Sequence, residues 1–572
     1  MFKKITFSLI ALVALASYKS TEHNTTKPNN FVAPLYTDLP LGAIHPTGWL
    51  HDQLEIMRDG TTGHLDEVYA KVKNDNGWLG GKGDGWEETP YWLDGAVPLA
   101  YLLDDTILKA KVLKYINWTI DHQRPSGYFG PITKAERDSG AVITLANPEK
   151  GEDWWPKMVM LKAIQQYYTA TNDQRVIKFL TNYFHYQLAA LKICRINKWT
   201  DWAESRGTEN IMVAQWLYEK TKDEKLLELA DLLNQQCYPW STWLGGRTWV
   251  IDAAAQQNDN NWMHRHGVNV AMALKAPALE FQRTHDSTYL TSLKTGYNDL
   301  MTLHGLPMGV FSADEDLHGN LPTQGTEMCA VVESMFSLEE IIAITGDVHY
   351  MDALERIAFN ALPTQTTDDY NNKQYFQVAN QVEIAKGVFD FSLPFGREMN
   401  NVLGMRSGYT CCLANMHQGW TKYAQHLWYK TQDNGVASLV YGPNRLSTTV
   451  GKNNTAVTIN EVTDYPFNDQ IDFELSTKNT AQFEWKLRIP SWCAEATVSL
   501  NGKELQKAKG GHFVIIGRTW KDKDKLVLKF PMQVSTSNWG RNSRAVERGP
   551  LVYALKLGER WEKGNDKYEG DY

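Results

Sequence analysis

The sequence is poor in cysteine and has no excess of positive charge. Six cysteines occur in 572 residues, far below the density of small disulfide-stapled secreted domains. The formal net charge is −8 and no long run of like charge occurs, so nucleic acids are not expected partners. Beyond the N-terminus, no apolar run is long enough to cross a bilayer, and we expect no transmembrane segment.

The N-terminus has the pattern of an export signal. Lys3 and Lys4 precede the apolar run ITFSLIALVALA, and Ala-Leu-Ala at 14–16 offers a cleavage site. The apolar run is too short to span a membrane. We therefore predict a signal peptide over residues 1–16 and a flexible segment over 17–34, with the mature protein in a periplasm or outside the cell. A buried first helix is the alternative.

From about residue 95 to 430 the sequence shows the spacing of successive amphipathic helices, with apolar positions at i, i+3/i+4 and i+7, and we predict a helical domain over 35–432. A Thr-x-Asp segment recurs between them, starting at Thr171, Thr221, Thr284 and Thr345. The Asp of such a segment can accept hydrogen bonds from the free N–H groups of the next helix. Stacked helical hairpins with long, irregular inserts favour an α/α toroid whose loops build a pocket, over an open solenoid.

The pattern changes after residue 432. Segments such as VASLVYGPNRLSTTV and QFEWKLRIP are short, β-branched and alternating, with polar turns between them. They predict an antiparallel β-sandwich domain over 433–572. The hydrophilic ending NDKYEGDY leaves open whether the natural chain extends further.

Tryptophan is abundant, with 21 residues, many of them in polar, glycine-rich loops. Trp155 lies in GEDWWPKM and Trp202 in NKWTDWAESRG, beside acidic and basic residues. Indole rings stack on the apolar faces of sugars while polar neighbours bind the hydroxyls, so Trp155 and Trp202 are candidate substrate-binding residues for a carbohydrate. The alternative is that these rings only cover large loops.

Three cysteines and one glutamate lie at two predicted helix starts. Glu327 and Cys329 occur in GTEMC, and Cys411 and Cys412 occur in YTCCLANMHQGW. Adjacent cysteines are poor disulfide partners, but three thiolates and a carboxylate form a complete tetrahedral set for Zn²⁺. The alternative is a core thiol at Cys329 and an incidental vicinal pair. The other cysteines are expected to be core residues: Cys194, Cys237 and Cys493.

GTEMC, followed about eighty residues later by YTCCLANMHQGW, resembles the metal-site motifs of glycoside hydrolase family 127. This family of β-L-arabinofuranosidases has an (α/α)6 barrel catalytic domain followed by β-sandwich domains. The resemblance implies that all four residues bind Zn²⁺ and that Cys411 is the nucleophile. It also implies an acid/base glutamate upstream, for which Glu315 in SADEDLHG is the first choice and Asp314 the runner-up.

The residue chemistry is coherent with this assignment. A metal keeps a thiolate deprotonated, and a thiolate is a good nucleophile. Glu315 would protonate the leaving oxygen and then deprotonate water, so that two displacements give net retention. Three alternatives stay open: a structural zinc with catalysis by paired carboxylates in an inverting hydrolase, a polysaccharide lyase, and a non-catalytic glycan-binding protein.

Histidines add further candidates. His266 in MHRHGVNVAMALKAP begins a predicted helix, in a context resembling a substrate-contacting histidine of the family, and His264 lies two residues before it. Glu327 is also expected to face the substrate, and His318 lies near Glu315. The family's arabinofuranosidases have a second sugar-contacting histidine where this chain reads ESRGTENIMVAQW. The sugar is therefore open, with β-L-arabinofuranose as the first expectation.

Overall fold

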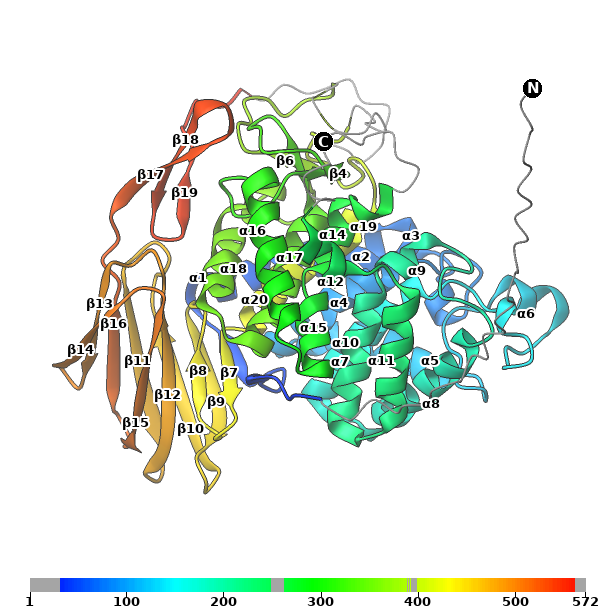
Figure 1. The fold of residues 1–572 in the computed structure, drawn as a ribbon, viewed down its shortest axis with the longest axis horizontal. Helices are drawn as coiled ribbons and strands as arrows, with labels where there is room; N and C mark the ends of the chain where they lie inside the picture. The colour runs from blue at the N-terminus through cyan, green and yellow to red at the C-terminus, as the bar shows by residue number, and fades with distance from the viewer. Residues whose placement is uncertain (1–30, 248–261, 388, 390, 392–398, 561–572) are drawn as a thin grey trace, which may run out of the picture.

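The computed structural model describes residues 31–247, 262–387, 389, 391 and 399–560, so the predicted signal peptide lies outside the described residues. A helical body lies on one side of the molecule and layered β-sheets on the other (Figure 1). A helical domain followed by antiparallel sheets is what the sequence predicts. Within the described ranges, no helix is both long and apolar enough to cross a membrane.

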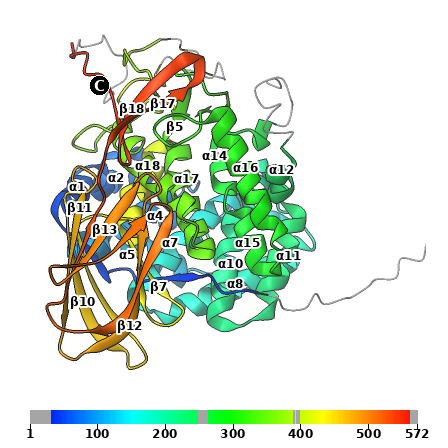
Figure 2. The same cartoon turned by 60° about the vertical axis from the view of Figure 1, so that its left-hand side comes forward.

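Almost fully buried helices pack against one another as a ring at the centre of the helical body, and Figure 2 shows this body from a second side. Each inner helix contacts the next, and the last contacts the first. In ring order they are α4 (Glu88–Leu102), α7 (Trp155–Thr171), α10 (Gly207–Thr221), α14 (Gly267–Ala273), α17 (Met328–Thr345) and α20 (Gln418–Gln425).

The helices outside this ring are amphipathic or short, and their buried residues face the inner ring or its loops. The longer ones are α1 (Gly48–Asp59), α5 (Thr106–Asp121), α8 (Gln174–Leu191), α11 (Glu224–Gln236), α16 (Thr288–His304) and α18 (Val348–Asn360). The shorter ones are α2 (Thr61–Val68), α3 (Ala70–Lys73), α6 (Lys134–Ser139), α9 (Asp201–Ser205), α12 (Trp240–Gly246), α15 (Ala276–Thr284) and α19 (Cys411–Asn415).

The four Thr-x-Asp segments connect helices, as predicted. In each segment the Asp amide donates to the Thr Oγ1 at 3.2–3.3 Å. The middle residue takes a positive φ, which ends the first helix. Asp173, Asp223 and Asp347 then accept a backbone N–H from the first turn of the next helix. One local motif therefore produces the repeated helix–turn–helix corners.

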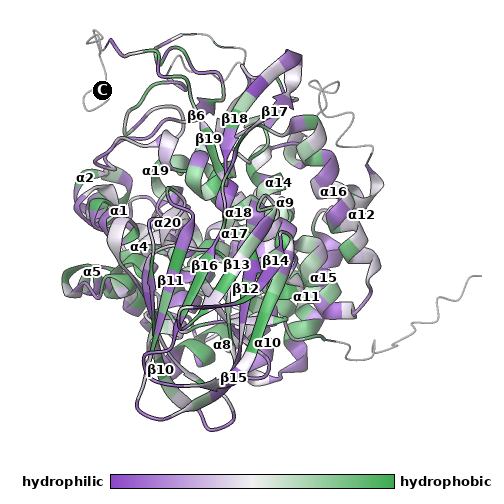
Figure 3. Cartoon of the chain, turned by 90° about the vertical axis from the view of Figure 1, so that its left-hand side faces the viewer, coloured by the Kyte–Doolittle hydropathy of each residue, from purple (hydrophilic) through white to green (hydrophobic). Residues whose placement is uncertain are grey.

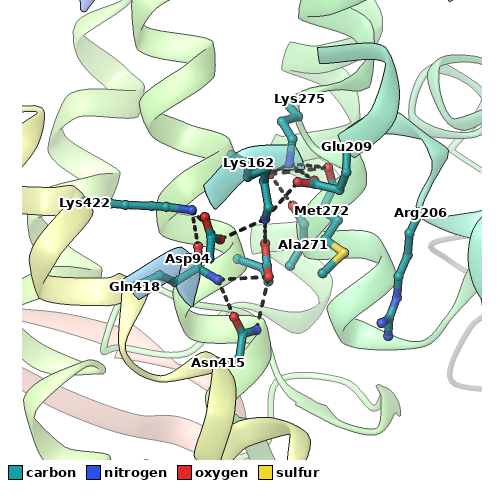
Figure 4. A network of polar contacts seen from close by, with 12 residues as sticks. Asp94, Lys162, Arg206, Glu209, Ala271, Met272, Lys275, Asn415, Gln418 and Lys422 are labelled. Atoms are coloured by element: carbon teal, nitrogen blue, oxygen red, sulfur yellow. Dashed lines mark hydrogen bonds and ion pairs between the residues drawn. The ribbon is translucent and has the colours of Figure 1, made fainter. Parts of the chain in front are cut away.

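Buried side chains of opposite charge form a network of ion pairs inside the helical body (Figure 4). We call this set the charge ring: Asp94, Lys162, Glu209, Lys275, Glu333 and Lys422. The Lys162 Nζ lies 3.2 Å from the Asp94 carboxylate and 3.0 Å from that of Glu209, and the Lys422 Nζ lies 2.7 Å from Asp94. All six side chains are at most 3% exposed, so the opposite charges offset one another's desolvation.

The β-rich part contains two large sheets packed face to face. The first has the order β1-β7-β8-β12-β15 and the second the order β14-β13-β16-β11-β10-β9-β2. Neighbouring strands pair antiparallel as predicted, except β8 and β12, which are parallel. Ring contacts of Phe473 in the second sheet with Trp428 (5.8 Å) and Trp485 (5.2 Å) in the first join the layers. Hydrophobic and hydrophilic residues interleave along these strands (Figure 3), as a sandwich requires.

The strands of the two large sheets have the following bounds. The first sheet contains β1 (Tyr36–Asp38), β7 (Trp428–Thr431), β8 (Val436–Ser438), β12 (Ala481–Ile489) and β15 (His512–Trp520). The second contains β2 (Ile44–Pro46), β9 (Asn444–Val450), β10 (Thr455–Val462), β11 (Gln470–Thr477), β13 (Glu495–Leu500), β14 (Lys503–Lys509) and β16 (Lys525–Lys529). The first two strands come from the segment before the helices, and each joins one of the sheets.

Two smaller sheets complete the fold. One has the order β17-β18-β19 and follows the sandwich (red in Figure 1), with strands Val534–Trp539, Ser543–Arg548 and Leu551–Tyr553. The other has the order β4-β3-β5-β6 and lies beside the helical body, with β3 (Ala313–Asp314), β4 (Asp316–Leu317), β5 (Gly325–Glu327) and β6 (Phe376–Val378). This second small sheet carries Glu315 and Glu327.

Candidate active site and metal centre

Glu327 and three cysteines meet where two helices begin. Glu327 ends strand β5, and Cys329 lies in the first turn of α17, while Cys411 and Cys412 are the first two residues of α19. Their ligand atoms all lie within 4.8 Å of one another. The structure therefore brings together the four residues that the sequence predicts as metal ligands.

The distances within this cluster fit a tetrahedral metal site. The Cys412 Sγ lies 3.3 Å from the Glu327 Oε1 and 3.2 Å from the Cys329 Sγ, and the Cys411 Sγ lies 3.8 Å from the Glu327 Oε1. Tetrahedral Zn–S and Zn–O bonds place their ligand atoms roughly 3.5–3.8 Å apart. The cysteines are free thiols, and among the described residues the buried Glu327 Oε2 has no hydrogen-bond partner. Three soft sulfurs and one oxygen suit Zn²⁺.

The thiols differ in acidity. Hydrogen bonds from Cys329 and Cys412 hold the pKa of Cys411 well below its usual value. Burial raises the pKa of Cys329 and of Cys412 well above theirs. The protein alone therefore favours a thiolate at Cys411, and a bound divalent cation would supply the charge that ionises the other two.

Lys373 fixes the loop that leads into the vicinal pair. Its buried Nζ donates to the backbone carbonyl of Tyr409 at 2.9 Å and to that of Ser407. Its positive charge also helps to lower the pKa of Cys411. Lys373 therefore sets both the position and the electrostatic surroundings of Cys411.

Glu315 lies at the turn between β3 and β4, with a φ of +78° that a non-glycine residue rarely adopts. The Tyr375 hydroxyl donates to its Oε1 at 2.6 Å, and the His266 Nε2 lies 3.3 Å from its Oε2. Ligand atoms of Glu315, His266 and Glu327 again lie within 4.8 Å of one another. The strained turn thus places the Glu315 carboxylate beside the Glu327 carboxylate of the cysteine cluster, and such strain is common at functional sites.

Asp314, the runner-up for the acid/base, has structural partners instead. It is fully buried, and its Oδ2 accepts a hydrogen bond from the Gly325 amide at 3.0 Å. The same oxygen lies 3.2 Å from the His318 Nδ1. Asp314 and His318 therefore stabilise the small sheet, and the geometry favours Glu315 for the acid/base role.

His266 is held in one orientation. It caps α14, where its Nδ1 accepts a hydrogen bond from the Asn269 amide at 3.3 Å. A neutral ring that accepts at Nδ1 carries its proton on Nε2, so His266 donates toward Glu315. Trp202 and Trp262 pack edge-on against its ring.

The other aromatic and histidine candidates have different surroundings. Trp155 is the first residue of α7 and is fully buried, with its indole N–H donating to Glu87. Trp202 is only partly buried and lies at the start of α9. The His264 ring packs edge-on against Trp243 at 5.2 Å. Substrate contact by these three residues stays a prediction.

Sequence reasoning missed three polar residues of this site. Tyr375 and Lys373 lie in the stretch YNNKQYFQV, whose alternation indicates only a strand. Arg206 precedes α10, and its guanidinium stacks over the rings of Trp155 and Trp202 at 4.3 Å from each. Strand pairing and helix ends bring the Tyr375 hydroxyl to Glu315 and the cations Lys373 and Arg206 to Cys411. The sequence alone does not show these long-range contacts.

Two family models show the class of enzyme to which this chain belongs. The family model of the β-L-arabinofuranosidase GH127 catalytic domain matches residues 24–425, and that of the GH127 middle domain matches residues 435–532. The chain belongs to the GH127 family and is a glycoside hydrolase of the β-L-arabinofuranosidase type.

Solved structures with the same fold include GH127 enzymes. A β-L-arabinofuranosidase from Geobacillus stearothermophilus T6 has a TM-score of 0.67 and 18% identity, with 89% of this chain and 86% of that chain covered. A GH127 β-arabinofuranosidase has a TM-score of 0.64 and 18% identity, with 91% and 85% covered. A further glycoside hydrolase has a TM-score of 0.68 and 17% identity, with 91% and 85% covered. No curated protein sequence matches the chain.

Proposed function

We propose that the protein is an exported, retaining glycosidase that releases a terminal sugar from plant-type polysaccharide or glycan side chains. β-L-Arabinofuranose is the first candidate for that sugar. Family membership supports the glycosidase activity, and the N-terminal pattern supports export. We assign the catalytic domain as an (α/α)6 barrel, because inner helices α4, α7, α10, α14, α17 and α20 close on one another.

The observation that carries the mechanism is the meeting of Glu315 with the cluster of Glu327, Cys329, Cys411 and Cys412. We infer that these last four residues hold Zn²⁺, which when bound keeps the thiolates ionised and protects them from oxidation after export. Cys411 is the least buried of the three cysteines and has the lowest pKa, so it is the sulfur best placed to react.

In the first step, the Cys411 Sγ attacks the anomeric carbon while protonated Glu315 gives its proton to the departing glycosidic oxygen. The C–O bond breaks and an S-glycosyl bond to Cys411 forms. In the second step, the Glu315 carboxylate takes a proton from water, which displaces the sulfur. The Tyr375 hydroxyl and the His266 Nε2 lie against the two oxygens of the Glu315 side chain and fix its orientation. Two inversions at one carbon give retention.

An aryl β-L-arabinofuranoside tests this proposal. We expect Cys411→Ala to lose at least about 10³-fold in kcat and Glu315→Gln about 10²–10⁴-fold with a poor leaving group. Cys493→Ala changes a buried cysteine of the sandwich domain and should leave turnover unchanged. Proton NMR of the first product formed should show the retained anomer.

Three outcomes would contradict parts of this proposal. Full turnover in Cys411→Ala, with an inverted product, would favour paired carboxylates and a structural zinc. Glycan binding without turnover of any glycoside would favour a binding protein. Much less than about one zinc per chain in freshly purified protein would remove the metal site.

A further inference from the structure

Arg206 lies beside the candidate active site, and part of its guanidinium makes no hydrogen bond to the described residues. The residue precedes α10, and its side chain is 6% exposed. Its guanidinium stacks over the indole rings of Trp155 and Trp202, 4.3 Å from each centroid. Stacking on rigid aromatic rings fixes the plane of the guanidinium, so its N–H groups point in set directions.

The protein uses only part of the hydrogen-bonding capacity of Arg206. The Nε donates to the Asn269 Oδ1 at 2.7 Å, and one terminal nitrogen lies 3.5 Å from the Glu87 Oε2. That Glu87 oxygen already accepts the Trp155 indole N–H. Within the described ranges, no other hydrogen bond reaches the guanidinium. Because a guanidinium has five N–H donors, the end formed by its two terminal nitrogens keeps free donors.

The charge ring does not use Arg206. The Arg206 side chain leaves the helix start close to Glu209 but points away from the network that Glu209 joins (Figure 4). Within the charge ring each cation already has an acidic partner: Lys162 pairs with Asp94 and Glu209, Lys275 with Glu209, and Lys422 with Asp94. The charge ring therefore does not need the positive charge of Arg206.

Arg206 belongs to the same wall of the site as the acid/base. Asn269 accepts from Arg206 through its side chain and donates through its backbone amide to His266. His266 in turn lies against Glu315. Arg206 is thus linked to Glu315 through Asn269 and His266.

We propose that Arg206 determines specificity by binding a carboxylate of the substrate glycan, on the sugar attacked by Cys411 or on the sugar next to it. A buried guanidinium with a weak counter-ion is costly, and a carboxylate relieves that cost far better than a neutral hydroxyl. The two terminal nitrogens match the two oxygens of a carboxylate in a bidentate pair. The inference rests on the proposed glycosidase function and narrows its substrates to acidic glycans.

Binding of D-galacturonate, with D-galactose as its neutral match, tests the inference independently of turnover. Trp155 and Trp202 flank Arg206, so their fluorescence reports ligand binding to the zinc-loaded protein. We expect galacturonate to bind at least about tenfold more tightly than galactose to the wild type. Arg206→Gln should bring the two affinities within about twofold, and Arg206→Lys should keep a weaker preference.

A matched control and a fold check keep the result interpretable. Arg283 is also buried and pairs with Asp231, so Arg283→Gln should keep the preference for galacturonate. Zinc content and the thermal unfolding midpoint show whether Arg206→Gln folds. If it does not fold, the partial loss of preference for galacturonate expected in Arg206→Lys tests the inference instead. Equal binding of galacturonate and galactose to the wild type would overturn the inference, as would an undiminished preference in Arg206→Gln.

Two kinetic experiments show which sugar of the substrate carries the carboxylate. Cleavage of an aryl uronide would place it on the released sugar. Competitive inhibition of aryl β-L-arabinofuranoside hydrolysis by galacturonate, without uronide cleavage, would place it on the neighbouring sugar. Hydrolysis of the neutral arabinofuranoside with no effect of galacturonate would leave the proposed function intact and refute the role of Arg206. Galacturonate binding without turnover of any glycoside would refute the proposed function instead.

Discussion

Tyr375 is the residue that most directly positions the proposed acid/base. Its hydroxyl donates to the Glu315 Oε1 at 2.6 Å in a fully buried contact. We expect Tyr375→Phe to lower kcat by about 10–100-fold while KM changes little, because the lost hydrogen bond acts on proton transfer more than on binding. Steady-state kinetics on an aryl glycoside measure this effect. Tyr350→Phe, at a buried tyrosine of α18, is the control, and equal losses in both variants would contradict the assignment.

At the residue scale, the sequence predicts the four candidate metal ligands better than it predicts the residues that surround them. Glu327, Cys329, Cys411 and Cys412 lie in two short motifs, and soft ligands at helix starts have few other uses. Tyr375 reaches the site only because β6 pairs with β5, which leaves the Tyr375 carbonyl accepting from the Met328 amide at 3.1 Å. Such pairing across about fifty residues has no local signature. Arg206 was missed for the same reason.

At the scale of elements, one glutamate connects the two helices that carry the thiolates. Glu333 lies one turn after Cys329, and its Oε1 accepts from Asn415 at 3.1 Å and from Gln418 at 3.0 Å. Asn415 lies one turn after Cys411. The Glu333 contacts therefore link α17 to α19 and α20, one helical turn away from the candidate metal ligands Cys329 and Cys411.

We expect Glu333→Met to bind zinc about 10–100-fold more weakly than the wild type, as losses of groups that orient metal ligands do. Competition with a chromogenic chelator measures this affinity. Glu339→Gln removes another buried carboxylate of α17 that pairs with His426 and contacts none of the cysteines, so it should retain zinc. Unchanged zinc affinity in Glu333→Met would show that the helices keep their spacing without it.

The end of α20 carries a pH-dependent contact. His426 is buried between Glu339 (3.2 Å) and Asp38 (3.8 Å), and the attraction of these acids outweighs burial and raises its pKa to about 9. Because the folded-state pKa exceeds the unfolded value near 6.5, the stabilisation is complete below pH ~6.5 and is lost as the pH rises through 9.

His426→Gln should therefore be less stable than the wild type by about 2–3 kcal/mol at pH 6, with a gap that shrinks toward pH 9.5. Urea unfolding at several pH values measures the gap. A gap that stays constant with pH would mean that His426 is not protonated in the folded protein.

Elements with a local signal follow the sequence closely. The Thr-x-Asp corners are predicted because their capping bonds join residues two positions apart. The small sheet β4-β3-β5-β6 was not predicted, because β3 and β4 contain two residues each and show no periodicity. The sequence pattern places Trp155 in a loop, whereas the residue begins α7 in the buried inner ring.

At the scale of the whole molecule, a buried arginine joins the sandwich to the helical body. Arg488 of β12 is fully buried and pairs with Asp352 at 2.7 Å and Glu355 at 2.5 Å, both in α18. Arg488→Met leaves the Glu355 charge buried without its cation, so we expect a loss of about 3–5 kcal/mol and separate unfolding of the two parts. Calorimetry detects both effects. Arg518→Met, at a partly exposed pair with Asp524, should cost less than about 1 kcal/mol.

The joining of the two parts was only partly predictable. The change from helical to alternating patterns after residue 432 predicts the β-rich part, but the boundary itself stays a prediction. Strands β1 and β2 belong to that part although they precede every helix of the described residues, because each adds to the edge of one large sheet. β1 and β2 contain three residues each, which is too short for an alternating pattern. The sequence therefore does not show that this N-terminal segment pairs with strands of the β-rich part.

The most direct test of the account asks where the sugar becomes covalently attached. Glu315→Gln removes the base that activates water, so an activated aryl β-L-arabinofuranoside should load the protein faster than water can release the sugar. Peptide mass spectrometry of the loaded variant should find one glycosyl residue on Cys411 and none on Cys329 or Cys412. A glycosyl group on a carboxylate, or no adduct from a substrate that the wild type hydrolyses, would contradict a thiolate nucleophile.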